Sequence, residues 1–111
     1  MAIYITQGRY TDSAVKGMVD KPEDRAQAVA ALIKAAGGKM LDYYVTLGEH
    51  DFLIVCEADG DSDFLAALMV AGASGGVTGL TSTQAFTTAA AKSAMEKANA
   101  IRAGFQAAGA G

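Results

Sequence analysis

One segment of this chain, residues 41–57, limits the possible folds more than any other. Two runs rich in aromatic and β-branched residues flank a short polar break at residues 48–51. This pattern predicts a β-hairpin with a four-residue connection, in which Gly48 supplies a positive φ. Because both runs are apolar on both faces, the hairpin should lie in a sheet that has neither face fully in water.

The rest of the chain predicts the elements around this hairpin. A strand is expected from Ile3 to about Tyr10, and a short helical piece should follow an N-cap chosen from residues 11–13. Pro22 then re-starts a helix that ends at a glycine pair, residues 37–38. After the hairpin, an apolar helix over residues 64–71 and a threonine-rich strand over residues 77–86 complete the pattern.

The predicted order is therefore βαββαβ, which is an α+β, ferredoxin-like plait. Its crossovers place the four strands in the order 4-1-3-2, with every neighbouring pair antiparallel. Helices then cover one face of the sheet only. We expect the other face to carry Tyr4, Tyr44 and Phe52 or their neighbours, and to be hidden against a second copy in a dimeric α/β-barrel arrangement. On that face Tyr4, Tyr44, Thr6 and Met40 are expected to form dimer core or to line a cavity.

Composition and charge bound the class of protein. With 111 residues, 51% hydrophobic and 19% charged, the chain is expected to form one globular domain. Its net charge of −3 comes without a basic, aromatic-interleaved surface, so nucleic-acid binding is not expected. It shows neither a signal-peptide pattern nor a membrane-spanning apolar stretch, which predicts a cytoplasmic protein with no membrane partner.

The segment over residues 87–111 differs from the rest. Ten of its residues are alanine, and it contains three basic residues and one acidic residue, whereas residues 1–86 contain six basic and eleven acidic residues. A heptad-like stripe predicts a C-terminal helix: Ala91, Ala94, Ala98, Ile101, Phe105 and Ala108. Three alternatives are open for this helix, namely packing on its own domain or on a dimer mate, docking to a different protein, and a partly ordered end.

Polar side chains should gather at one end of the predicted sheet. Antiparallel pairing of the first and third strands brings Arg9 and Tyr10 near His50 and Asp51, with Glu49 and Asp12 close by. In a small-molecule site, Asp51 would orient His50 for proton transfer and Arg9 would hold a carboxylate or phosphate. In a purely structural cluster, Asp51 would instead bond backbone N–H groups and Arg9 would pair with a nearby carboxylate.

Other chemistries have weaker support. A single histidine with scattered carboxylates lacks a recognisable metal-ligand spacing, so neither a metal nor another cofactor is predicted. Cys56, the only cysteine, alternates with apolar residues and is expected to be a small buried hydrophobe. Catalytic residues are not assigned, and His50 and Asp51 are the candidates. For ligand binding, the candidates are Arg9, Tyr10, Tyr4, Tyr44 and Glu49.

Several motifs in order resemble the GYD-domain family: residues 8–12, 36–39, 46–52 and 83–86. The resemblance covers residues 1–86 and implies an α/β plait from a family of small bacterial and archaeal proteins whose role is largely uncharacterised. Gly48 and Asp51 match the signature for which the family is named, while His50 stands where the family commonly has tyrosine. Residues 1–86 are thus expected to form a GYD-like domain and residues 87–111 a separate alanine-rich helix or tail.

Three functions remain open from the sequence. The first is a homodimeric or larger module that binds a small ligand or a protein partner. The second is a cofactor-independent enzyme that oxidises or isomerises a small organic compound, by analogy with other plait dimers. The third is a scaffold or assembly subunit that uses the C-terminal helix.

Overall fold

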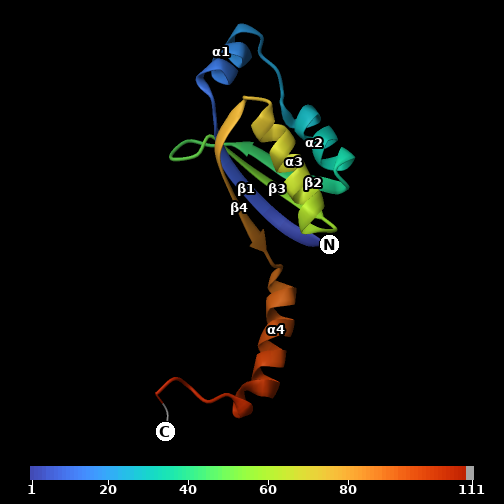
Figure 1. Cartoon of the computed structure of the whole chain (residues 1–111), viewed down its shortest axis with the longest axis vertical. Helices are drawn as coiled ribbons and strands as arrows, with labels where there is room; N and C mark the ends of the chain where they lie inside the picture. The colour runs from blue at the N-terminus through green and yellow to red at the C-terminus, as the bar shows by residue number, and fades with distance from the viewer. Residues whose placement is uncertain (110–111) are drawn as a thin grey trace.

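A computed structural model describes residues 1–109 as a four-stranded sheet with helices on one face and a long helix that extends away from it (Figure 1). The elements in chain order are β1 (Ala2–Tyr10), α1 (Asp12–Asp20), α2 (Ala26–Ala35), β2 (Gly38–Val45), β3 (Phe52–Ala58), α3 (Asp61–Ala73), β4 (Val77–Ala85) and α4 (Thr88–Ile101). The sheet order is β2-β3-β1-β4, and every neighbouring pair is antiparallel. This is the predicted order read from the other edge, so the α+β ferredoxin-like plait is confirmed.

Two helices form the first crossover, as predicted, but the second begins at Ala26 and not at Pro22. The Thr11 hydroxyl accepts a hydrogen bond from the N–H of Ala14 at 3.3 Å and caps α1. The helix ends at Asp20, and α2 begins only at Ala26, whose N–H donates to the Asp24 carboxylate at 2.9 Å. Residues 21–25, called the strap below, therefore form a non-helical link between α1 and α2.

The hairpin connection is longer than predicted. It runs over residues 46–51, and the N–H of Thr46 donates to the carbonyl of Asp51 at 2.8 Å to close it. Gly48 has a φ of 118°, so the predicted need for glycine in this turn is confirmed. The prediction of a four-residue connection is wrong because the chain leaves the sheet two residues earlier, at Thr46.

The core lies between the sheet and the helices α2 and α3. Cys56 on β3 is only 1% exposed, which agrees with its expected role as a small buried hydrophobe. Tyr4 on β1 lies beside it in the register and stacks its ring on Phe64 of α3, with 4.2 Å between ring centroids. Ile33 of α2 completes this buried cluster. Contacts across one sheet face therefore join β1 and β3 to both covering helices.

The predicted composition of the second sheet face is wrong in part. Tyr4, Thr6, Met40 and Phe52 all lie on the helix-covered face, and only Tyr44 of the expected set lies on the opposite face, where it is 57% exposed. Tyr4, Thr6, Met40 and Phe52 do share one face, and the error is in which face the helices cover. A β-bulge between Met40 and Asp42 separates Tyr44 from them. The extra residue reverses the alternation along β2, so that Met40 and Tyr44 point to opposite sides although they are an even number of residues apart.

The second face of the sheet, called the bare face below, still has an apolar centre. Ile5 of β1 pairs with Val55 of β3, and Ile3 and Leu53 lie on the same face, so that four partly exposed apolar side chains share it. Both α2 and α3 lie on the other side (Figure 1). The predicted imbalance, with apolar residues on both faces but helices over one, is present in the described part of the chain.

The last helix, α4, does not pack on its own domain. It extends from the end of β4 away from the sheet (Figure 1), and every residue in it except Ala91 is exposed. The helix ends at Ile101 and is followed by one 3₁₀ turn, Arg102–Gly104. Phe105 and Ala108 therefore lie outside the helix, and the expected stripe stops short of them. Within the first alternative, packing on its own domain is therefore not observed in the described residues, while packing on a dimer mate and the other two alternatives stay open.

Candidate functional site

The residues predicted to gather at the end of the sheet do lie together. Arg9 Nε donates a hydrogen bond to the Glu49 carbonyl at 2.8 Å. The N–H of Tyr10 donates to Asp51 Oδ2 at 2.9 Å, and the N–H of Asp51 donates to the Gly8 carbonyl at 2.7 Å. These three bonds join the end of β1 to the hairpin connection.

The bonds in this cluster are those of a structural junction. Asp51 uses its carboxylate on a backbone N–H, and in the described chain no hydrogen bond or ion pair links it to His50. Arg9 bonds a backbone carbonyl and not a carboxylate. The hollow here has a volume of about 620 Å³ and is widely open to solvent, and its lining includes Arg9, Asp12 and Glu49 but not His50. The predicted catalytic pairing of His50 with Asp51 thus has no contact to support it.

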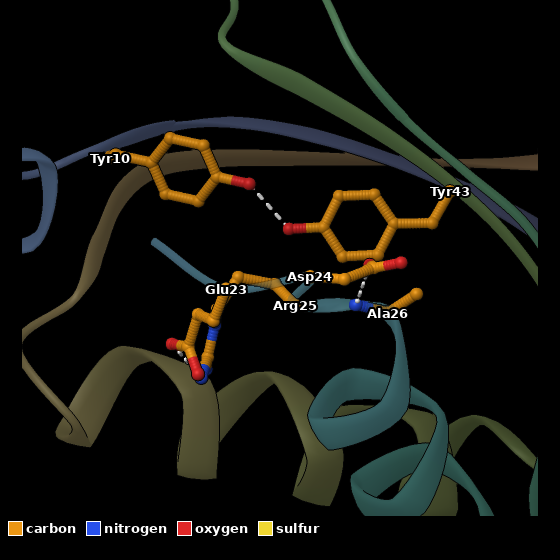
Figure 2. Close-up of polar contacts among 6 residues, drawn as sticks. All are labelled: Tyr10, Glu23, Asp24, Arg25, Ala26 and Tyr43. Carbon is orange, nitrogen blue, oxygen red and sulfur yellow. Dashed lines mark hydrogen bonds and ion pairs between the residues drawn. The ribbon is translucent and has the colours of Figure 1, made fainter. Parts of the chain in front are cut away.

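A second group of polar side chains lies on the helix-covered side of the same end of the sheet. The hydroxyl groups of Tyr10 and Tyr43 are hydrogen-bonded to each other (Figure 2). Tyr10 was a predicted ligand-binding residue, whereas sequence reasoning missed Tyr43. Phe52 lies against both rings, with centroid distances of 5.1 Å to Tyr10 and 6.3 Å to Tyr43. The junction at Asp51 therefore fixes the backbone of Tyr10, and Phe52 fixes both rings.

The strap runs past this phenol pair. Figure 2 shows Glu23, Asp24 and Arg25 between the phenol pair and the helices. Arg25 Nη1 lies 3.1 Å from Glu23 Oε1, and the Asp24 carboxylate caps α2 at the N–H of Ala26. Both charged side chains of the ion pair are part of a non-helical segment, and they are about half exposed.

A cleft surrounds the phenol pair and has two lobes. The lobes have volumes of about 470 Å³ and 570 Å³, and the phenol rings and the strap border both. The first lobe opens toward α1 and the hairpin, and the second toward α2 and α3. Apolar side chains form most of the walls: Val15, Met18, Val19 and Val45 in the first lobe, and Val29, Leu32, Val70 and Val77 in the second.

The environment of the phenol pair keeps Tyr10 protonated. Burial raises the pKa of Tyr10 above its ordinary value, the hydrogen bond between Tyr10 and Tyr43 raises it further, and the positive charge of Arg25 opposes the increase. A phenol with a raised pKa is neutral at physiological pH. Tyr10 can therefore donate a hydrogen bond to a ligand, but it is not suited to removing a proton from one.

Raising the pH above about 10 should destabilise the protein more than it destabilises the Tyr10→Phe variant. The unfolded chain loses the Tyr10 proton near its ordinary pKa of 10.0, whereas the folded chain keeps it because the folded-state pKa is higher. The contribution to stability is thus complete below the unfolded pKa and is lost as pH rises toward the folded pKa. Urea unfolding at about pH 8 and about pH 11 measures it, and equal pH dependence in the two proteins would contradict it.

The other two predicted tyrosines lie apart from the cleft. The Tyr4 hydroxyl donates to Oδ1 of Asp61, an exposed residue at the start of α3, and this hydrogen bond is the main reason that the pKa of Tyr4 is raised. Tyr44 lies on the bare face. Over residues 1–109 no cluster of three or more histidine, cysteine or acidic side chains is placed to hold a metal ion. In the same residues, no helix has both the length and the apolar character needed to cross a membrane.

Comparisons with solved structures identify the fold. The match to the crystal structure of MtbAldR covers 78% of this chain and 52% of the MtbAldR chain, with 15% sequence identity and a TM-score of 0.56. A protein from Thermus thermophilus matches the same share of this chain and 95% of its own, with 16% identity and a TM-score of 0.51. A transcriptional regulator from Neisseria meningitidis, solved as an L-Met complex, gives 16% identity and a TM-score of 0.50 over 78% of this chain and 50% of its own.

These likenesses are in fold alone, and this chain spans about half the length of the first and third proteins. The sequence matches no curated protein. The family model for the GYD domain matches residues 4–95, beyond the expected limit at residue 86 and into the first half of α4. Because this match covers most of the sequence, the chain belongs to the GYD-domain family.

Proposed function

We propose that this protein is a cytoplasmic, homo-oligomeric module that binds a small organic ligand in the cleft around Tyr10 and Tyr43. The observation that carries the proposal is the hydrogen-bonded phenol pair, placed between two lobes whose walls are mostly apolar. Ligand sites are commonly concave and apolar with a few converging polar groups. Here the polar groups come from two strands that are not neighbours in the sheet, β1 and β2.

The phenol pair suits binding better than proton abstraction. One hydroxyl donates to the other, so one O–H of the pair remains to donate to a ligand oxygen. The raised pKa of Tyr10 keeps its proton in place at neutral pH. A carbonyl, hydroxyl or acidic oxygen on an apolar molecule fits this arrangement.

A panel of small neutral compounds tests the proposal. We expect cyclohexanone, benzamide or 2-phenylethanol to shift the NMR signals of Tyr10, Tyr43 and Phe52 in the full chain. The double variant Tyr10→Phe/Tyr43→Phe, which removes the one O–H that the pair offers, should bind the same compounds roughly 3–10-fold more weakly, since one neutral hydrogen bond contributes about 0.5–1.5 kcal/mol. Tyr44→Phe is the matched control because Tyr44 lies on the bare face, and its affinity should equal that of wild type. Shifts confined to Arg9 and His50 would contradict this site.

The alternative function, an enzyme, requires other residues at the same end of the sheet. A cofactor-independent enzyme would need His50 and Asp51 to act on a bound compound. The Asp51 carboxylate, however, is engaged by the N–H of Tyr10. In the binding module, His50→Ala leaves affinity for the panel unchanged, whereas in an enzyme it abolishes turnover while the fold survives.

A second role, assembly with further copies, is favoured by α4. Met95 and Ile101 are each more than 60% exposed on this helix, and isolated helices of this length are marginal in water. Residues 87–111 are net basic and residues 1–86 are net acidic. Electrostatic attraction between residues 87–111 of one copy and residues 1–86 of another is therefore favourable. The bare face offers a second apolar surface to the same partner.

A further inference from the structure

The two lobes of the cleft differ in charge. The ionisable side chains that line the second lobe are Lys21, Glu23 and Arg25, apart from the two phenols, so positive charge is in excess there. The first lobe has Arg25 against Glu23, Asp24 and Asp51, so negative charge is in excess there. Residues 1–86 as a whole are acidic, with eleven acidic and six basic residues. A local excess of positive charge beside an apolar wall is thus a departure from the surrounding surface.

Arg25 has N–H groups that can donate further hydrogen bonds. Its guanidinium carries five N–H groups, and in the described chain it makes one ion pair, with Glu23 at 3.1 Å. Both residues belong to the strap and neither is held in a helix, so the guanidinium can turn toward the lobe without unwinding α2. Arg25 is also close enough to Tyr10 for its charge to act on that phenol. A planar guanidinium and a nearby phenol O–H form a good donor set for a carboxylate.

The remaining walls of the second lobe are apolar. Val29 and Leu32 of α2 face Val70 of α3 across it, and Val77 closes the end next to β4. A smaller apolar void of about 90 Å³, lined in part by Val29, Leu32 and Val77, lies deeper between the sheet and the helices. An apolar group that enters beneath Tyr43 would therefore be removed from water, which stabilises binding by about 25 cal/mol per Å² of buried area.

We propose that the ligand of this cleft is a small monocarboxylic acid with an apolar body. Its carboxylate would lie between Arg25, Lys21 and the Tyr10–Tyr43 pair, and its aliphatic or aryl group would lie along Val29, Leu32 and Val77. This inference rests on the proposed ligand-binding function and names the ligand class. Asp24 and Asp51, which line the first lobe and not the second, set the orientation because they repel the carboxylate from that side.

The test compares acids with their amides. Benzoate and hexanoate, and benzamide and hexanamide, would be titrated into the isotope-labelled full chain at neutral pH. We expect the acids to bind on the order of tenfold more tightly than the matching amides. Arg25→Gln should abolish that preference, while Lys16→Gln, which removes a positive charge from α1 outside the cleft, should keep it.

The outcomes separate this inference from the proposed function. Equal affinities of acid and amide, with shifts at Tyr10 and Tyr43, would retain the cleft as a site and overturn the acid assignment. So would an acid preference that survives in Arg25→Gln. If neither the four compounds nor the neutral panel shifts signals in the cleft, the proposed function and this inference both fail.

Discussion

Replacing Phe52 with alanine should lower the free energy of unfolding by about 3–5 kcal/mol. Phe52 is 2% exposed, and its ring supports both members of the phenol pair. The space left by the ring would be hard to refill. Its neighbour across the sheet is Gly8, where even a Cβ would come within 2.8 Å of Phe52 Cζ, so no side chain from β1 extends into the gap. A cavity that cannot collapse costs more than the lost transfer free energy alone.

Urea unfolding of the full chain measures this effect. Leu47→Ala is the matched control, because Leu47 is fully exposed in the hairpin connection and its truncation should change stability by less than about 0.5 kcal/mol. Phe52→Leu should fall between alanine and wild type. A loss below about 1 kcal/mol for Phe52→Ala would mean that the ring is not part of a close-packed core. The same variant should also lose affinity for ligands of the cleft, since the rings of Tyr10 and Tyr43 would lose their support.

The strand order could be predicted because it depends on patterns that tolerate small errors. Alternating apolar runs, a glycine pair after a helix and a glycine in a turn each identify an element without fixing its ends. The face on which each side chain lies depends on the register, and one extra residue reverses it. The bulge near Leu41 leaves no clear mark in the sequence, which is why Tyr44 was expected on the same face as Tyr4, Thr6, Met40 and Phe52. Those four do share a face, but strand alternation alone does not say which face the helices cover.

The cluster of polar side chains at one end of the sheet could be predicted, whereas the phenol pair on the helix-covered side of that end could not. Antiparallel pairing of β1 with β3 is enough to bring Arg9 and Asp51 together. It does not reveal that Asp51 bonds the backbone of Tyr10, nor that Tyr43 reaches Tyr10 across β3. A signal did exist, because Tyr10 follows Gly8, which pairs with Phe52, and Tyr43 pairs with Ile54, two residues from Phe52. Using it requires knowing that Tyr43 shares a face with Tyr10, which again depends on the bulge.

Removing residues 87–111 should reduce the number of subunits in the assembly that the protein forms in solution. We expect the full chain to form at least a dimer of its 11.3 kDa subunit at micromolar concentration, with α4 adding contacts between copies. The truncated chain keeps all four strands, because β4 ends at Ala85. Light scattering of both proteins measures the change. Two results would exclude an assembly role for α4: a full chain that is monomeric, or a truncated chain that forms assemblies with the same number of subunits as the full chain.

Two point variants on α4 separate a specific contact from a general effect of the segment. Met95 lies on the same side of the helix as Ala91 and Ala98, whereas Ser93 lies on the other side. Met95→Glu and Ser93→Glu add the same charge to the same helix, and both positions are exposed. Burying a methionine side chain contributes about 1.5–3 kcal/mol, so Met95→Glu should weaken association by roughly one to two orders of magnitude, while Ser93→Glu should leave it near wild type. Equal effects of the two variants would mean that the net charge of residues 87–111, and not the apolar side of α4, governs association.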